Sequence, residues 1–375
     1  MIIEIHMLKS FPPTNLNRDD TGSPKTCLFG GVQRGRISSQ CQKRSWRISD
    51  VFRDSPIGAL GIRTRKMPQL VGEALERQDV EADYVKAAVK LLSGFGNKEG
   101  KVKTEGITTQ IAFYAQPEID ALAKLFMELR EQGKTAKDIN GMNAADVQKT
   151  FGKQCTSPVT LDIALFGRMV TSEAFKDVDA AMQVAHAIST HKMSPESDYF
   201  TAVDDLLSDE DAGSGGAGMI GDVEYNACCY YMYACLDVDQ LRTNLQDADE
   251  REAIIKAAVP AIVEAMAFVN PSGKQNTFAG HSLPEVIVVE KKTRKIPVSY
   301  ANAFIDPARA SAKEGLVENS VHLLAKEIDR IDEKFMLPVD SRLWLEQHDF
   351  LAPQKAEVCA NFDELQKKVA LLAAQ

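Results

Sequence analysis

Ile2-Ile3-Glu4-Ile5-His6-Met7-Leu8 opens the chain with apolar and polar side chains that roughly alternate. A period of two places successive side chains on opposite faces of a β-strand. Ser10-Phe11-Pro12-Pro13-Thr14 follows, and this composition is typical of a turn. We therefore expect a strand with one buried face that ends near Ser10, so that a β element begins the domain.

A β-hairpin and a helix are predicted next. Residues 25–38 form the candidate hairpin, with Gly30 and Gly31 at a turn or a bulge. Ser38 and Ser39 are favourable N-cap residues, and the helix that they begin is expected to run over 40–52. The Pro-Ile-Gly sequence at 56–58 should end this segment.

The remaining chain combines helical and β patterns. Residues 67–169 are predicted to be mainly helical, with helices over 71–92, 109–130 and 144–151, and a further helix is expected over 178–190. Residues 194–221 are acidic and then Gly-rich, which predicts a mobile loop. The expected elements after it are a strand over 222–237, a helix over 242–270, a hairpin of 285–290 with 296–299, and helices over 307–335 and 361–374. Because strands lie towards both ends, we expect an α+β fold whose sheet is assembled from distant segments.

Composition predicts an ordinary soluble protein with a substantial core, since 44% of its 375 residues are hydrophobic. The longest apolar stretches, such as 257–269, are shorter than a membrane span, and the first residues lack the pattern of an export signal. We therefore expect a cytoplasmic protein. The seven cysteines include no C-x-x-C pair and the histidines no H-E-x-x-H, so neither disulfides nor a metal site is expected.

Positive charge is concentrated near the N-terminus, although the net charge is −9. Residues 25–66 carry ten basic side chains and two acidic ones, a local +8 that leaves −17 for the remainder. A local excess on an acidic body suits a groove for a polyanion, because the acidic remainder limits nonspecific binding. A chance cluster on a solvated surface explains the charge about equally well.

The predicted helix collects hydrogen-bond donors on one face. Gln40, Lys43, Arg44 and Arg47 fall at i, i+3, i+4 and i+7, which are neighbours on a helix surface. The helix N-terminus adds free backbone N–H groups and the positive end of the helix dipole, and the two capping serines stand beside them. Such a surface follows the phosphates of a nucleic acid without reading its bases.

Other residues near this helix admit different roles. Trp46, Ile48, Val51 and Phe52 are expected to pack in the core. Asp19 and Asp20 could form the metal-binding pair of a nuclease, but pairing with Arg18 or capping their loop is the favoured role.

Several motifs also resemble a known family in the order in which they occur. They are L-N-R-D-D (16–20), F-G-G (29–31), R-I-S-S-Q-x-x-K-R (36–44), D-I-A-L-F-G-R-M (162–169), A-H-A-I-S-T-H (185–191), Y-F-T-A-V-D-D-L (199–206) and Y-A-N-A-F (300–304). Together they resemble the CasC-type backbone subunit, which binds guide RNA (crRNA) in the type I-E CRISPR Cascade complex. The resemblance spans residues 1 to about 305, and 70–153 and the C-terminal tail match only loosely.

The resemblance implies a right-hand-like architecture. A palm built on a modified RNA-recognition-motif sheet, which is ferredoxin-like, would take residues 1–58 and 222–375. Helical fingers would take 59–180, the end of a palm helix 181–192, and a thumb loop 193–221. In the family, copies stack head to tail along the crRNA, and each thumb folds over it and displaces a base at regular intervals. Target DNA pairs with the segments between, and other Cascade subunits are partners in this antiviral defence complex.

The resemblance also assigns roles to residues, none of them catalytic, and implies no cofactor or metal. The guide RNA would be contacted by Arg18, Lys25, Ser38, Ser39, Gln40, Lys43, Arg44, Arg47, Met169, Phe200 and Thr201. Met169 would wedge beside the displaced nucleotide, although core filling is the ordinary role of a methionine. Lys134, Lys137, Lys149 and Lys153 are candidates for contacting target DNA. Val32 and Gln33 stand where the family can carry basic residues, which implies a weaker grip there.

Two alternatives remain open from the sequence. One is a metal-dependent nuclease that uses Asp19 and Asp20, for which only this adjacent pair of carboxylates lies near the basic segment. The other is a monomeric RNA-recognition-motif protein, but the chain lacks the aromatic run on a strand that such proteins use to stack bases.

Overall fold

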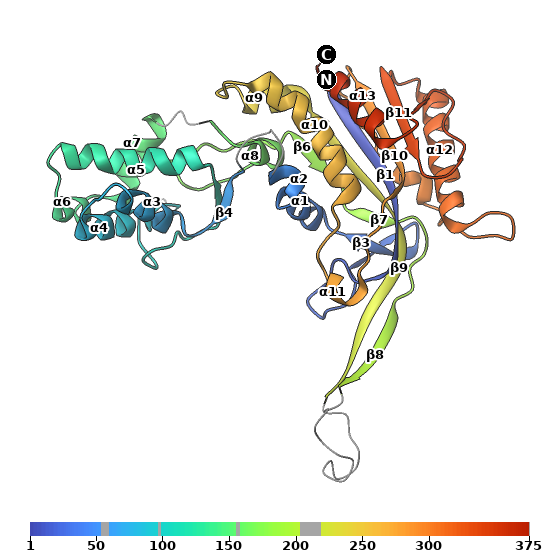
Figure 1. Cartoon of the computed structure of the whole chain (residues 1–375), viewed down its shortest axis with the longest axis horizontal. Helices are drawn as coiled ribbons and strands as arrows, with labels where there is room; N and C mark the ends of the chain where they lie inside the picture. Colours follow the sequence, from blue (N-terminus) through green and yellow to red (C-terminus); the bar gives the residue numbers. More distant parts are fainter. Residues whose placement is uncertain (54–59, 97–98, 155–157, 203–218, 375) are drawn as a thin grey trace, which may run out of the picture. The chain divides into compact units, whose positions relative to one another are not determined.

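The computed structural model describes residues 1–53, 60–96, 99–154, 158–202 and 219–374. By its internal contacts the chain divides into two compact units. The first contains residues 1–49, 184–235 and 262–372, and the second contains 50–183, 236–261 and 373–375. Figure 1 labels the elements of both units, and each unit is described by itself.

A mixed sheet forms the first unit. Its strands follow the order β12-β11-β10-β1-β9-β7-β3-β2, with β6 and β8 also pairing with β9. Their bounds are β1 Ile2–Thr14, β2 Thr26–Phe29, β3 Val32–Ile37, β6 Met182–Val184, β7 Ala187–Ser189, β8 Glu196–Ala202, β9 Met219–Asp237, β10 Pro284–Lys292, β11 Ser341–Glu346 and β12 Glu357–Val358. The N-terminal strand β1 thus lies between strands from the second half of the chain, which confirms an α+β fold assembled from distant segments.

Strand β1 is longer and more buried than its alternation predicts. It runs through the two prolines to Thr14, and residues 2–9 are all buried. Its polar members have buried partners: Glu4 lies 2.5 Å from the ammonium group of Lys292, and the His6 ring lies 2.8 Å from the Tyr231 hydroxyl. The prediction of one solvent-facing side was therefore wrong, because polar side chains on a strand also alternate when they meet a buried polar network.

Helices and a 3₁₀ segment cover this sheet. They are α1 Ser39–Arg47, α11 Gln275–Phe278, η1 Tyr300–Phe304, α12 Leu316–Phe335, α13 Phe362–Ala374 and the second part of α10, Arg251–Phe268. A core cluster joins Val321, Leu324 and Ile328 of α12 to Val288 and Trp344 of the sheet. This packing buries the apolar stripe of α12 against β10 and β11, which hydrogen-bond in antiparallel register.

The second unit is mainly helical. Its elements are α2 Asp50–Arg53, β4 Ile62–Thr64, α3 Met67–Glu76, α4 Ala82–Leu92, β5 Ala112–Tyr114, α5 Gln116–Glu131, α6 Ala136–Asn140, α7 Ala144–Gln154, α8 Leu161–Phe166, α9 Val238–Asn244 and the first part of α10. Its core gathers apolar side chains of α3, α4 and α5, among them Leu75, Leu92 and Phe126. Strands β4 and β5 form a separate antiparallel pair in this unit.

Several predicted elements differ from the structure. The helix expected over 178–190 is wrong, because β6 and β7 occupy this range, and β7 lies in the sheet between β9 and β3. The hairpin partner expected at 296–299 is also wrong, since β10 pairs instead with β1 and β11. The helices expected over 71–92 and 242–270 are each divided in two by a turn, and the one expected from 307 begins at Leu316.

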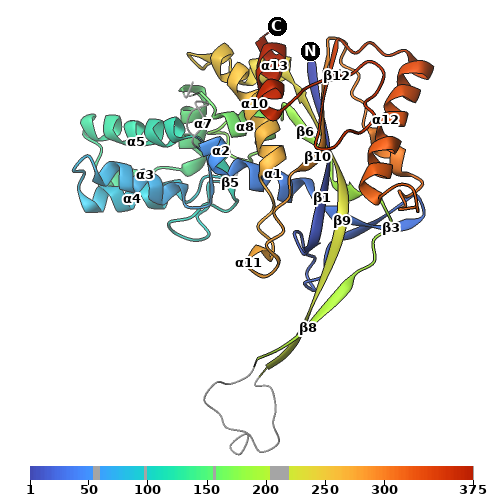
Figure 2. The same ribbon diagram turned by 45° about the vertical axis from the view of Figure 1, so that its right-hand side comes forward.

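The mobile loop expected over 194–221 is wrong towards both of its ends, because β8 occupies 196–202 and β9 begins at Met219. Strands β8 and β9 pair from Glu196 with Tyr225 to Ala202 with Met219, and residues 203–218 lie outside the described residues. Figures 1 and 2 both show this hairpin projecting from the rest of the sheet. The strand over 222–237, the hairpin over 25–38 and the helices near 144–151 and 361–374 are confirmed.

Within the described residues, no helix combines the length and the hydrophobicity that crossing a membrane requires.

Candidate functional site

Helix α1 begins where the sequence predicts. Ser38 adopts an extended backbone, and its hydroxyl accepts a hydrogen bond from the Cys41 N–H at 3.3 Å. The Ser38 N–H donates a hydrogen bond to the Asn17 side-chain oxygen at 2.9 Å. This bond joins the start of the helix to the loop after β1. The first turn contains no acidic residue, so its backbone N–H groups and the positive dipole end keep their attraction for an anion.

The four residues predicted on one face of α1 are all accessible. Gln40 and Arg44 are exposed, whereas Lys43 and Arg47 are half-buried. Burial lowers the pKa of Lys43 from its usual value. Trp46 is 2% exposed, as expected of a core residue, but Ile48 is 40% exposed, so its predicted place in the core was wrong. Ser39, the first helical residue, is buried and takes no part in the cap.

An open hollow lies beside α1. Its volume is about 540 Å³, and its lining joins the loop over 16–22 to Cys41, Arg44 and Ser45 of the helix. Arg18 and Arg44 therefore meet at one cavity although 26 positions separate them. Ser272 and Gly273 form another part of the wall. A Cβ on Gly273 would lie 2.3 Å from the Leu16 carbonyl oxygen, so only glycine allows this approach.

Two titratable groups report the electrostatics of this surface. Burial raises the pKa of the Cys41 thiol, and the positive charges of Lys25 and Arg44 act against that rise. Burial lowers the pKa of His186, and the nearby charges of Arg36 and Lys25 lower it further. The Arg36 guanidinium lies 3.0 Å from the His186 ring nitrogen. Lys25, predicted from the sequence, thus lies near both α1 and the Arg36 side of the sheet.

Asp19 closes its own loop. One of its carboxylate oxygens accepts hydrogen bonds from the Thr21 N–H at 2.9 Å, the Thr21 hydroxyl at 2.7 Å and the Ser23 N–H at 3.0 Å. These bonds, led by the one from the Thr21 hydroxyl, lower the pKa of Asp19. Asp20 is exposed at the hollow. Across the described ranges, no three His, Cys, Asp or Glu side chains gather closely enough to hold a metal ion.

Arg34 lies apart from the basic surface because it is completely buried. Its guanidinium donates to the carbonyl oxygens of Phe29, Ser189, Thr190, Phe304 and Ile305 at 2.6 to 3.3 Å. The side chain holds the β2–β3 hairpin to β7 and to η1, so it is unavailable to a ligand. The positive charge counted along residues 25–66 therefore exceeds the charge presented at the hollow. Four residues of that count belong to the second unit, namely Arg53, Arg63, Arg65 and Lys66.

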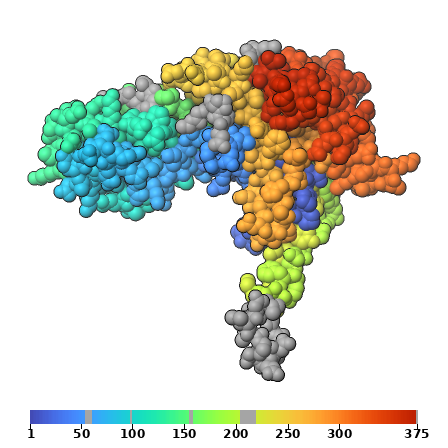
Figure 3. Space-filling view, viewed as in Figure 1, coloured from blue at the N-terminus to red at the C-terminus, as the bar shows by residue number. Residues whose placement is uncertain are grey.

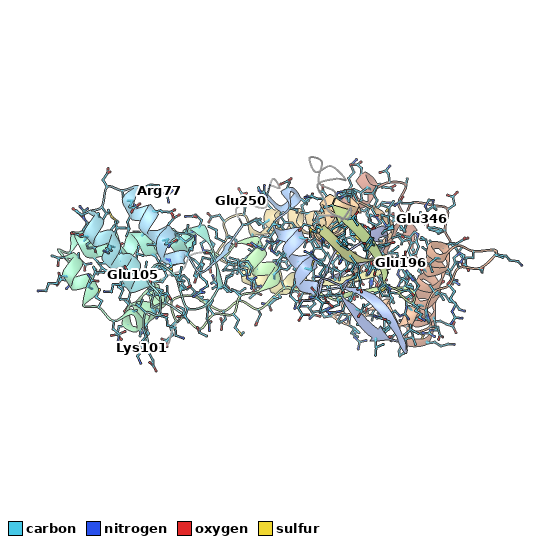
Figure 4. All side chains as sticks on the ribbon, turned by 90° about the horizontal axis from the view of Figure 1, so that it is seen from below. Arg77, Lys101, Glu105, Glu196, Glu250 and Glu346 are labelled. Carbon is cyan, nitrogen blue, oxygen red and sulfur yellow. The ribbon has the colours of Figure 1, made fainter. Side chains whose placement is uncertain are left out.

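Phe200 and Thr201 lie on the β8–β9 hairpin, where every residue of β8 is exposed. Phe200 faces Gly221 on the paired strand, and a Cβ at Gly221 would lie 2.6 Å from the Phe200 ring. The base of the hairpin is acidic, with Glu196 and Asp198 on one strand and Asp222 and Glu224 on the other. Figure 3 shows the hairpin protruding, and Figure 4 labels Glu196 near its base.

Met169 belongs to the second unit, and its side chain is 91% exposed. Core filling, the ordinary role of a methionine, is therefore wrong for this residue. The four lysines predicted to contact DNA, Lys134, Lys137, Lys149 and Lys153, are also exposed in this unit. Lys149 and Lys153 stand four residues apart on α7, and Lys134 and Lys137 flank the cap of α6, where both act on Asp138.

Several residues that line the hollow were not predicted from the sequence. Asn17 belongs to the L-N-R-D-D motif, but its hydrogen bond with the Ser38 N–H depends on the geometry of the loop and has no signal in the sequence. Ser45 lies one turn after Cys41 on the predicted helix, so helical spacing could have found it. Ser272 and Gly273 come from a segment more than two hundred residues away and gave no local signal.

Comparisons with known proteins agree with this architecture. A chain of a structure titled "CRISPR RNA-guided surveillance complex, pre-nicking" superimposes with a TM-score of 0.83 at 28% identity, and each chain is covered completely. A chain titled "CRISPR RNA-guided surveillance complex" matches with a TM-score of 0.74 at 24% identity and equal coverage, a likeness of fold. No curated protein sequence matches the chain. Residues 3–369 match the family model of CT1975-like proteins, a Cas family, and the chain therefore belongs to the CT1975-like protein family.

Proposed function

We propose that this protein is a non-catalytic, crRNA-binding backbone subunit of a CRISPR Cascade complex, of the CasC kind found in type I-E systems. The observation that carries the proposal is the cationic surface around α1, where Arg18 and Arg44 line one hollow and Lys25 lies close by. A relative at 28% identity belongs to an RNA-guided surveillance complex, which supports RNA as the polyanion.

The surface suits a sugar–phosphate backbone. A phosphate at the start of α1 would receive hydrogen bonds from backbone N–H groups and Gln40, while Lys43, Arg44 and Arg47 neutralise its neighbours. Ser38 serves this grip by capping the start of the helix, of which Ser39 is the first residue. None of these groups selects a base, so the protein would accept any guide sequence.

Apolar side chains supply the second part of the proposed mechanism. Met169 and Phe200 are exposed, and such side chains act on bases rather than phosphates, while Thr201 is an exposed neighbour of Phe200 on β8. An apolar wedge costs a few kcal/mol of unstacking per step, which the backbone contacts must offset. In this proposal the sheet of the first unit is the palm on a modified RNA-recognition motif, 59–180 are the fingers, and the β8–β9 hairpin carries the thumb.

The proposal includes assembly. Successive copies would bind head to tail along one crRNA, each covering an equal length, with other Cascade subunits at the ends. Target DNA would pair with the exposed guide, and Lys134, Lys137, Lys149 and Lys153 would contact it from the fingers. Such contacts would be electrostatic and independent of sequence.

Native mass spectrometry of the full chain with RNAs of increasing length tests this function. The filament predicts a copy number that rises by one for each fixed increment of RNA length. A single copy on every RNA would instead support the monomeric RNA-recognition-motif alternative. In the control, heparin replaces the RNA. Simple polyanion binding predicts that the copy number on heparin does not rise in fixed steps of length.

A cleavage assay tests the non-catalytic part. Assembled protein is incubated with complementary RNA or DNA and Mg²⁺ or Mn²⁺, and we expect no product. One oxygen of the Asp19 carboxylate accepts three hydrogen bonds from its own loop, and these bonds hold the loop closed. Cleavage that Asp20→Ala abolishes would establish the nuclease alternative.

A further inference from the structure

Met169 is an exposed side chain in a tightly held segment. Its apolar side chain is 91% exposed, whereas its neighbour Arg168 is 5% exposed. We infer that Arg168 is a positioning residue that, together with Glu118, fixes the backbone so that Met169 stands ready to insert beside an RNA base. This inference rests on the proposed function and concerns how its wedge is held.

Arg168 has a buried acidic partner. Its guanidinium lies 2.7 Å from a Glu118 carboxylate oxygen, and the two side chains are 2% and 4% exposed. The same Glu118 oxygen accepts the Ala115 N–H at 2.8 Å, which joins the ion pair to the start of α5. The anchor of the Met169 segment is therefore part of the helical framework of this unit.

The guanidinium also holds the segment to itself. It donates twice to the Lys176 carbonyl oxygen, at 2.9 and 3.1 Å, and once to the Phe113 carbonyl at 3.2 Å. The backbone of Arg168 exchanges two hydrogen bonds with Val178, at 2.8 and 2.9 Å. Residues 168–178 thus form a loop that is closed by the pairing of Arg168 with Val178. The Arg168 guanidinium reinforces this closure by its hydrogen bonds to Lys176.

The other side of Met169 is fixed as well. The Val170 N–H donates to the Asp177 carboxylate at 2.7 Å, and the Thr171 hydroxyl donates to the Gly96 carbonyl at 2.7 Å. Gly167, on the near side, has a φ of +79°, and a Cβ there would lie 3.0 Å from the Val178 carbonyl oxygen. Met169 is therefore directed outwards from a backbone held at both of its neighbours.

The chemistry of arginine suits this role. A wedge that unstacks a base works best when its backbone is ordered before the RNA arrives, because ordering on binding consumes affinity. Only a planar fork reaches one carboxylate and two carbonyl groups at once. Lysine would keep the charge opposite Glu118 but lose most of the contacts with Lys176 and Phe113.

The test maps base unstacking on an adenine-rich RNA of guide length, at saturating full-length protein, by dimethyl sulfate reactivity. Wild-type protein is expected to give reactive adenines at a regular spacing. Met169→Ala removes the wedge and sets the lower limit of this pattern. Arg168→Lys is expected to reduce the pattern about five-fold, which corresponds to about 1 kcal/mol, while RNA affinity stays within about two-fold of wild type.

Arg130→Lys is the matched control. Arg130 forms a similar fork with Glu81, at 2.6 and 2.9 Å, but these side chains are 36% and 64% exposed and lie apart from the loop. We expect its reactivity pattern to equal that of wild type. An equal loss in both variants would show a general effect of arginine replacement and overturn the inference.

The outcomes separate the inference from the proposed function. If Met169→Ala lowers the pattern and a folded Arg168→Lys does not, Arg168 has no positioning role and the inference is wrong. If Met169→Ala leaves the pattern intact, the wedge itself is wrong and the inference falls with it, while backbone binding at α1 is judged by its own assay.

A second variant covers the case in which Arg168→Lys does not fold. Asp177→Ala removes an exposed carboxylate that holds the Val170 N–H and leaves the buried ion pair in place. A loosened loop predicts a partial loss of the reactivity pattern without loss of thermal stability. If Asp177→Ala leaves the reactivity pattern unchanged, the action of Met169 does not depend on a held backbone, and the inference is refuted.

Discussion

Arg44→Gln is the most direct test of the cationic surface. Arg44 is exposed, lines the hollow with Arg18, and acts electrostatically on Cys41 together with Lys25. The proposed grip uses five cations per copy, namely Arg18, Lys25, Lys43, Arg44 and Arg47. Each contact with a single strand contributes roughly 0.7 to the slope of log affinity against log salt, so one copy should show a slope of roughly −3.5.

The variant should lower that slope to roughly −2.8, because glutamine keeps hydrogen bonding but releases no counterion. Because the two slopes differ by roughly 0.7, the ratio of wild-type affinity to variant affinity should fall by about 2.6-fold between 50 and 200 mM salt. The gap is therefore largest at low salt. Its size should not depend on RNA sequence, because phosphate contacts carry no base information.

Fluorescence anisotropy measures these slopes with labelled RNAs of two unrelated sequences, each short enough for one copy. Arg77→Gln is the matched control, since Arg77, which Figure 4 labels, is an exposed arginine at the C-cap of α3 in the other unit. We expect its slope to equal that of wild type. An unchanged slope in Arg44→Gln, or a loss confined to one RNA sequence, would refute the assignment of Arg44 to the phosphates.

Three further predictions concern the stability of the fold that presents this surface. Each is measured as a free energy of unfolding by chemical denaturation. Ser38→Ala should lower the free energy of unfolding by about 1 kcal/mol, because the Cys41 N–H loses its cap, whereas Ser39→Ala should lower it less. Gly30→Ala should cost more than about 2 kcal/mol, because its φ is +59° and a Cβ would lie 1.9 Å from the Ile305 carbonyl oxygen; Gly31→Ala, with φ +75° and open space around it, should cost only the backbone strain. Burial lowers the pKa of Lys9 from 10.5 to about 7, so as pH falls from 10.5 to about 7 the unfolded chain gains a proton that the folded chain does not. Stability should then fall by up to about 1.4 kcal/mol per pH unit, and Lys9→Met should remove this slope; a slope that persists in Lys9→Met would assign it to another group.

Elements specified by neighbouring residues were predictable from the sequence. The β2–β3 hairpin depends on a Gly-Gly turn, and α1 depends on a serine cap followed by a periodic face. Both signals lie within about ten residues, so the cap at Ser38 and the exposed face with Gln40 and Arg44 could be predicted correctly. The part of the candidate site that lies on α1 could be predicted from the sequence for the same reason.

Elements defined by distant partners were not predictable in this way. Strand β1 runs on to Thr14 through Pro12 and Pro13, and it lies between β10, which pairs with it as far as Lys9, and β9. These partners are nearly three hundred and more than two hundred residues away in the chain. Residues 178–190 have a helical pattern, yet β7 pairs there with β3 and β9 and completes the sheet. In both places the tertiary environment outweighs local propensity.

Burial also changes what a charge count means. Arg34, Lys9 and Lys292 are cations in the sequence, but each is buried against carbonyl or carboxylate groups. The same holds for the motifs that carried the family resemblance: Tyr300 of Y-A-N-A-F donates to buried Glu290, and Thr190 of A-H-A-I-S-T-H accepts from Arg34. Motifs of this kind identify a family through its framework. The proposed grip on RNA depends instead on the few cations that remain accessible around α1, and so it is at these positions that substitutions should change binding without changing the fold.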